Sequence, residues 1–166
     1  MKRSRSPKSI SQALIIGILL FQLFPQTVNK IDGFGGFKFG MTLDEAIQVR
    51  DDDIVNDNPT YFAAYKTIER ATSIYGYDAV IVAQINDKSK LLDRVVVEFR
   101  RWEGGCEEVA GVIIEKLLDI YGGEYVKSEN SKGTWTFPSG GTITMFNICY
   151  GDSGQVSVAY ASTIGL

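Results

Sequence analysis

The 166-residue chain contains no histidine, and this absence removes several kinds of catalytic site. Catalytic triads with a histidine base, histidine general acids and imidazole metal ligands are all excluded. The exclusion extends to Gly151-Asp152-Ser153-Gly154, which is similar to the segment around a serine-protease nucleophile. Without a histidine base Ser153 has no means of activation in that mechanism, and the same residue types are typical of hairpin turns. We interpret the segment as a turn.

Long apolar runs are also scarce. The run Ala13–Phe24 covers about 12 residues, whereas a membrane-spanning helix needs roughly 20. Four basic residues and no acidic residue precede it, and Pro25 follows it. A basic head followed by a short apolar run is typical of a secretory signal; the alternative, a buried helix of the folded domain, leaves the basic head unexplained.

We therefore predict that residues 1–28 are a signal peptide or a short N-terminal anchor and that residues 29–166 form a single domain. The expected location is periplasmic or secreted, in the bacterial envelope. If the N-terminal segment is not cleaved, the domain is tethered to the inner membrane by that segment alone.

Cysteine is rare, since the chain has only Cys106 and Cys149. In an exported protein both would lie in an oxidising compartment, where disulfides persist. We predict a disulfide between them, with two buried free thiols, which behave as small apolar side chains, as the alternative. No cysteine follows the apolar run near the N-terminus, so we expect no lipid anchor of the bacterial lipoprotein type.

Positive charge is scarce after the N-terminal segment. Four of the 17 basic residues and none of the 20 acidic residues precede Pro25, which leaves a net charge of about −7 for the rest of the chain. An acidic domain is unsuited to nucleic acid or to an anionic membrane surface. One basic and aromatic cluster remains as a candidate partner-binding site for an acidic group: Arg94, Arg100, Arg101 and Trp102. The alternative is a strand end with solvent-facing arginines whose stems cover apolar surface.

Two further patterns contain residue types that occur in ligand-binding sites. The carboxylates of Asp51, Asp53 and Asp57 could gather around a hard cation, but their spacing does not fit a calcium loop, and a solvated acidic loop is the favoured interpretation. The glycines between residues 33 and 40 do not fit the dinucleotide-binding pattern, because Lys38 replaces one of them and no strand precedes them. We expect no cofactor.

Hydrophobic periodicity and turn residues predict two helices and six strands. The first helix starts at a capping box formed by Thr42 and Glu45 and ends near Arg50; the second follows Gly104-Gly105 and stops at Gly122-Gly123. A Gly/Phe-rich segment, residues 29–40, precedes the first helix, and its phenylalanines can anchor it to the core. The strands are expected at residues 64–72, 77–85, 91–100, 133–138, 142–150 and 155–162.

The predicted fold class is α+β, with an antiparallel sheet and the helices on one face of it. Residues 41–101 and 105–163 share the order of a helix followed by antiparallel strands, and are two candidate tandem repeats. A single sheet packed against two helices explains the order equally well.

The segment Gly36-Phe37-Lys38-Phe39-Gly40-Met41-Thr42-Leu43-Asp44-Glu45-Ala46 resembles a set of small exported bacterial proteins in which an F-G-M-[ST] motif opens the first helix. More distantly, the chain is similar to the outer-membrane assembly lipoprotein BamE (small protein A) and to β-lactamase-inhibitor-like proteins. Tyr121-Gly122, Trp135 and Tyr160 continue the resemblance to the first set. The resemblance implies a sheet presented as a binding face and brings no catalytic residue with it.

Together these patterns favour an exported, non-catalytic domain that binds a protein or an envelope component. The alternative is a small exported hydrolase-type enzyme that uses carboxylates such as Glu98 or Glu107, or a metal at the loop of Asp51. An acidic cleft with shifted carboxylate pKa values would favour the enzyme. An exposed apolar or aromatic patch would favour the binding domain.

Overall fold

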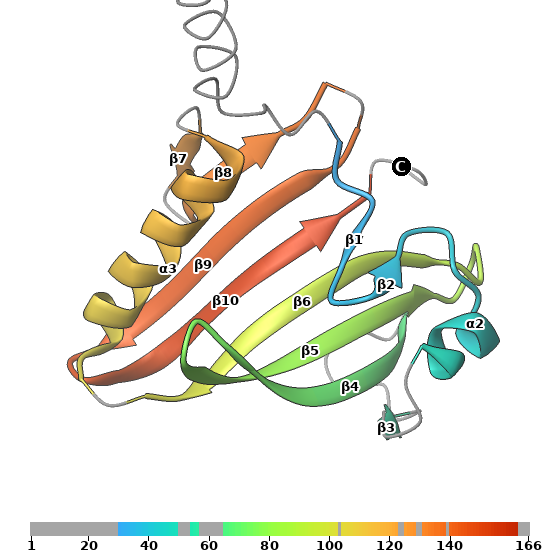
Figure 1. The fold of residues 1–166 in the computed structure, drawn as a ribbon, viewed down its shortest axis with the longest axis horizontal. Coiled ribbons are helices and arrows are strands. Elements are labelled where there is room, and N and C mark those ends of the chain that lie inside the picture. The colour runs from blue at the N-terminus through green and yellow to red at the C-terminus, as the bar shows by residue number, and fades with distance from the viewer. Residues whose placement is uncertain are drawn as a thin grey trace, which may run out of the picture.

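The computed structural model describes residues 30–49, 54–56, 65–102, 104–122, 125–128, 131–138 and 140–162. The predicted signal or anchor segment, residues 1–28, and the candidate metal ligands Asp51, Asp53 and Asp57 lie outside these residues. Strands dominate the described chain, as Figure 1 shows. In this part of the protein, no helix has both the length and the apolar character that a membrane span requires.

The main sheet has eight strands, and every neighbouring pair is antiparallel. In spatial order they are β3 (Ile54–Asn56), β4 (Tyr65–Ile74), β5 (Tyr77–Asn86), β6 (Leu92–Arg101), β10 (Ser153–Ala161), β9 (Thr142–Tyr150), β8 (Ser131–Thr136) and β7 (Val126–Ser128). The order is mirrored about the central pair of β6 and β10, in which the last strand of each half meets the other (Figure 1).

Alternation along the central strands builds the core. Along β6 the side chains of Val95, Val97 and Phe99 are buried, because successive residues of a strand point to opposite faces of the sheet. On β10 their register partners Tyr160, Val158 and Val156 are buried as well. We call the face that carries these side chains the inner face, and the opposite one the outer face.

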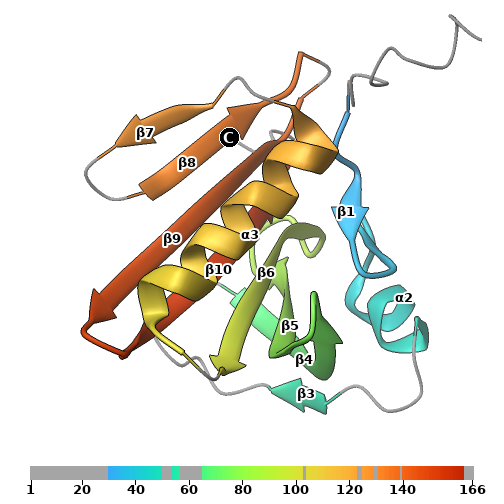
Figure 2. The same ribbon diagram turned by 60° about the vertical axis from the view of Figure 1, so that its left-hand side comes forward.

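Helix α3 (Cys106–Tyr121) covers the inner face over β8, β9 and β10 (Figure 2). Its buried side chains recur at helical spacing. Among them, Val109, Ile113 and Leu117 follow one another at intervals of four residues and pack into the core. The helix stops at Gly122, whose φ of 87° is a conformation that other residues rarely adopt. The predicted second helix is therefore confirmed at both ends.

A short hairpin lies beside α3 on the inner face, where its first strand contacts both central strands, β6 and β10, and its turn reaches β4 and β5 (Figure 1). It consists of β1 (Gly33–Phe34) and β2 (Phe37–Lys38), and the Phe37 side chain is only 1% exposed. The Arg70 guanidinium on β4 donates a 3.0 Å hydrogen bond to the Gly35 carbonyl and lies 5.3 Å from the centroid of the Phe37 ring. The expected anchoring of the Gly/Phe-rich segment is confirmed at Phe37.

The turn of this hairpin requires a glycine. Gly35 has a φ of 63°, and a Cβ atom there would lie 2.7 Å from Cδ1 of Ile81 and 3.0 Å from the Arg70 guanidinium. Both the backbone conformation and the close approach to β5 exclude a larger residue without local rearrangement.

The predicted α+β class, with helices on one face, is wrong. The protein is mostly β, and helix α2 (Leu43–Gln48) has only six residues, of which Ala46 alone is buried. Its capping box is present as predicted, with Thr42 accepting from the Glu45 amide. The chain just before it pairs with the start of β6, where the Met41 carbonyl accepts a 2.7 Å hydrogen bond from the Leu92 amide.

Because the apolar stripe of α2 is so narrow, the hairpin supplies the apolar cover that a second long helix was expected to provide. The two helices are therefore not equivalent parts of two repeated helix-plus-strands units. The mirrored order belongs to the strands alone.

Candidate binding face on strand β9

Strand β9 carries apolar side chains on both of its faces near its C-terminal end. Met145, Asn147 and Cys149 point toward α3, where Cys149 and Asn147 contact the helix. The residues between and after them, Phe146, Ile148 and Tyr150, therefore lie on the outer face. Their side chains are 38%, 55% and 76% exposed. We call these three residues the outer row.

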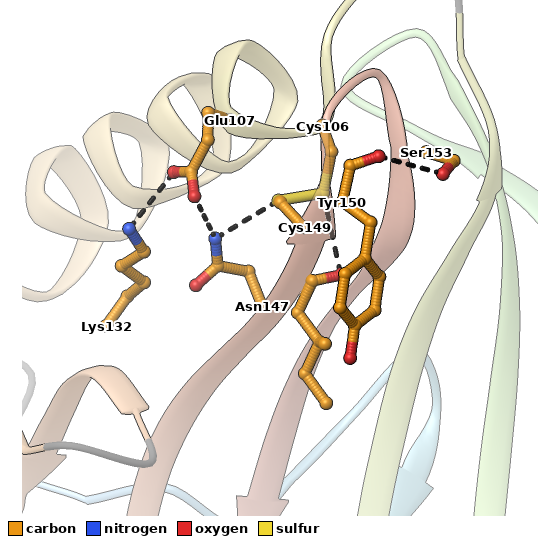
Figure 3. The surroundings of a disulfide bond; sticks show 8 residues. Cys106, Glu107, Lys132, Asn147, Cys149, Tyr150 and Ser153 are labelled. Carbon is orange, nitrogen blue, oxygen red and sulfur yellow. Dashed lines mark hydrogen bonds and ion pairs between the residues drawn. A yellow bond between two sulfur atoms is a disulfide. The ribbon is translucent and has the colours of Figure 1, made fainter.

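The inner side of the same segment is fastened to the helix, as Figure 3 shows. A disulfide joins Cys106, the first residue of α3, to Cys149, with 5.6 Å between their Cα atoms. The predicted disulfide is therefore confirmed. The Asn147 amide donates to the Glu107 carboxylate at 3.2 Å, and the Lys132 ammonium lies 3.0 Å from the other oxygen of that carboxylate. One covalent bond and one hydrogen bond thus hold β9 against the N-terminal turn of the helix, and the ion pair of Lys132 ties β8 to the same turn.

The outer row is an unusual concentration of exposed apolar surface for this chain. Among the described residues, seven large apolar side chains are prominently exposed, and three of them are these alternate residues of β9. Single exposed apolar residues are ordinary on protein surfaces, but an adjacent group is typical of interaction sites.

Small and polar residues border the row on β10. The register places Ser153 opposite Tyr150, Gln155 opposite Ile148 and Ser157 opposite Phe146. Beside these neighbours the three apolar side chains keep the exposures given above.

An ion pair lies beyond this polar border. Glu98 on β6 is the register partner of Ser157 and forms an ion pair with Arg100, two residues further along the same face. An aromatic and aliphatic centre with polar and arginine-containing surroundings is the usual composition of a protein-binding patch.

The predicted cluster of Arg94, Arg100, Arg101 and Trp102 is distributed along β6. Arg94 pairs with Gln84 on β5 and Ala161 on β10, whereas Arg101 pairs with Asp78 at the other end of the strand. Trp102 packs against the core. Arg100 lies on the outer face across β10 from the outer row, and the backbone positions of Arg94 and Arg101 are at opposite ends of β6.

The carboxylates considered for an enzyme, Glu98 and Glu107, lie on opposite sides of the sheet. Glu98 is on the outer face and is paired with Arg100, whereas Glu107 is on α3 and is paired with Lys132. General acid–base catalysis needs two groups that reach the same substrate atoms. The described geometry does not provide that arrangement for this pair.

Shifted pKa values in the described protein have structural causes. The backbone and hydroxyl of Thr42 donate hydrogen bonds that lower the pKa of the Glu45 carboxyl, which is part of the capping box. Burial raises the pKa of Tyr160 well above its usual value, and raises that of Tyr121 at the end of α3. Tyr160 belongs to the core beneath the helix and the hairpin, where Phe34 stacks on it at 4.5 Å.

The outer row was not singled out from the sequence, although the sequence contains the signal. Residues 142–150 were recognised as a strand, and a bonded Cys149 must point inward toward α3. Period-two alternation then places Phe146, Ile148 and Tyr150 on the other side. Combining the predicted disulfide with the predicted strand would have identified the exposed row.

Within the described ranges, no three Cys, Asp or Glu side chains gather in a group that could hold a metal ion. Comparisons of the chain with family models, with curated proteins and with solved structures found no match.

Proposed function

We propose that this protein is an exported, non-catalytic binding domain that recognises a protein partner through the outer row of β9. The observation that carries the proposal is the exposure of Phe146, Ile148 and Tyr150 as adjacent residues on one face of a strand whose other face is covalently fastened. Aromatic and aliphatic side chains of this kind supply most of the binding energy in protein interfaces.

Rigidity of the strand favours binding. Ordering a flexible loop or strand on association costs free energy, and a segment that is already held in its bound conformation avoids that cost. The disulfide and the Asn147–Glu107 contact hold the β9 backbone on its inner side. The outer row is thereby presented in a fixed spacing without any contribution from the partner.

Charge favours a protein with a neutral or basic surface as the partner. The chain after Pro25 carries a net charge of about −7, which repels nucleic acid and anionic lipid headgroups and attracts cationic protein surfaces. Arg100, across β10 from the row, is already paired with Glu98. It therefore adds no free positive charge that would recruit an acidic membrane.

Three observations support export. The disulfide between Cys106 and Cys149 is of a kind that persists in oxidising compartments and is rare in the cytosol. The basic head and short apolar run at the start of the chain are typical of a secretory signal. The F-G-M-[ST] motif, which resembles that of small exported bacterial proteins, agrees with this location.

Photo-crosslinking in intact cells tests the proposal. A benzophenone amino acid replaces Ile148 in the full-length chain, and in a matched control it replaces Ile120 on α3, which is similarly exposed at 45%. We expect a discrete adduct with a different protein at position 148 and none at position 120. The adduct should disappear when Phe146 and Tyr150 are both replaced by serine.

Three results would contradict the proposal. Adducts that contain only a second copy of this chain would indicate self-association, and adducts that contain only lipid would indicate membrane contact. An adduct that persists in the variant with Phe146→Ser and Tyr150→Ser would show that the outer row does not select the partner.

A further inference from the structure

A groove lies on the inner side of the molecule, between α3 and the β7–β8 end of the sheet. Its volume is about 210 Å³, and it is lined by Glu107, Ala110, Gly111, Ile114, Tyr125, Lys127 and Lys132. Drug-sized ligands occupy pockets of about 300 Å³ or more. A groove of this size therefore suits a ligand no larger than a single amino-acid residue.

The aromatic wall of the groove is fixed in place. Tyr125 stacks on the buried Trp135 with 4.9 Å between ring centroids, and the Trp135 indole N–H donates to the Gly122 carbonyl at 3.1 Å. The Tyr125 ring also lies against the backbone of β8, since a Cβ atom on Gly133 would be 2.6 Å from it. Part of the ring still lines the groove, next to Lys127.

The helical wall is kept open by a glycine. Gly111 is in the middle of α3, where glycine is less favourable than alanine by about 1 kcal/mol. A Cβ atom at this position would meet nothing within 4 Å, so packing within the protein does not require the glycine. Together with Ala110 and Ile114 it leaves an apolar hollow in which a larger side chain would fit.

The charges at the rim are unequal. Glu107 neutralises Lys132 at 3.0 Å. Lys127 lies 5.7 Å from the centroid of the Tyr125 ring, and among the described residues it has no carboxylate partner. The groove thus has an apolar floor, an aromatic wall and one ammonium group at its mouth, and its charged lining residues are two lysines and one glutamate.

We propose that this groove binds a small apolar carboxylate, with the apolar group beside Gly111 and Ile114 and the carboxylate on Lys127. The ammonium provides a charge-assisted hydrogen bond, and the Tyr125 ring provides an apolar surface next to it. The same chemistry is presented by a free aliphatic acid and by the C-terminal residue of a peptide. The site is on the opposite side of the sheet from the outer row and does not depend on the proposed function.

Titrations of the isotopically labelled full-length protein, followed by NMR, test this site with three probes. These are 4-methylpentanoate as a free acid, N-acetyl-leucine as a peptide C-terminus, and N-acetyl-leucinamide, which lacks the carboxylate. We expect at least one acid to bind with a Kd of about 1 mM and to shift the resonances of Gly111, Ile114 and Tyr125. The amide should bind about tenfold more weakly. Whichever acid binds more tightly identifies the source of the ligand.

Two variants distinguish a binding role from a structural one. Gly111→Leu fills the hollow and should abolish binding while raising the melting temperature, because leucine is the better helix former. Lys127→Gln should weaken acid binding about tenfold, whereas the control Lys88→Gln, on the exposed β5–β6 turn, should leave it unchanged. Equal affinity for acid and amide, unchanged binding in Gly111→Leu, or no shifts at about 10 mM of either acid would overturn the proposal.

Discussion

Strands β8–β10 are covered by the 16-residue helix α3, which a disulfide joins to β9, whereas strands β4–β6 lie against a hairpin that has two residues in each strand and is anchored on Phe37. The two halves of the sheet contribute strands in mirrored order. Each half buries one apolar face, but under a different element. The outer row of exposed apolar residues is on the half with the covalent link.

The comparison shows that the same strand order can be combined with two different covers of the inner face. In the hairpin-covered half, a glycine turn and the ring of Phe37 under the Arg70 guanidinium close the core by packing. In the helix-covered half, the disulfide and the Asn147–Glu107 hydrogen bond fix β9 from one side. A strand held in this way can carry apolar residues on its outer side without losing its position.

The largest expected effect is on the hairpin-covered half. Phe37→Ala removes a buried ring that β2 places under the Arg70 guanidinium. This change should lower the free energy of unfolding by about 4 kcal/mol. Urea unfolding measures the loss, and amide hydrogen exchange should show that protection falls first in β4 and β5. A loss of protection that begins in α3 would contradict the division into two differently covered halves.

Breaking the disulfide tests the other half. The bond closes a loop with a sequence separation of 43 residues, and its reduction should lower the free energy of unfolding by about 3 kcal/mol. In hydrogen exchange, α3 and β9 should lose protection while β4 and β5 keep theirs. The double variant with Cys106→Ala and Cys149→Ala should behave in the same way in the absence of a reductant. Unchanged exchange in β9 would show that the bond does not hold the strand.

The smallest effect concerns Tyr160, which contacts the hairpin cover through Phe34. Burial raises its pKa, so above about pH 10 the unfolded chain ionises this phenol while the folded protein keeps it protonated. Stability is therefore fully present below about pH 10 and is lost as the pH rises further. Tyr160→Phe should make the decline between about pH 10 and pH 11 shallower, as measured by urea unfolding. An equally steep decline would mean that other groups cause it.

Most long elements could be predicted from the sequence, because their signals are local. The alternating valines of β6, the glycines that flank α3 and the capping box at Thr42 each determine structure over a few residues. The short strands β1, β2, β3 and β7 were missed, since two or three residues give no readable period and form strands only by pairing with neighbours.

The cover of the sheet and the candidate site were harder to predict. The sequence indicates a short first helix with a narrow apolar face, but nothing in residues 43–48 shows that Phe37 covers the sheet instead. The arginines of β6 looked like a cluster because they are close in sequence, but the strand spreads Arg94 and Arg101 along its length. The outer row required two predictions, the strand and the disulfide, to be combined.

The most direct test of the binding role is the affinity of the protein captured at position 148, measured by calorimetry with purified components. For the variant with Ile148→Ser and Tyr150→Ser we predict a loss of about 100-fold or more, because each replaced side chain is an exposed apolar anchor. The matched variant Ile120→Ser, on α3, should bind within about twofold of the unmodified protein. Equal affinities for all three proteins, or an equal loss in Ile120→Ser, would contradict the assignment of the binding face to β9.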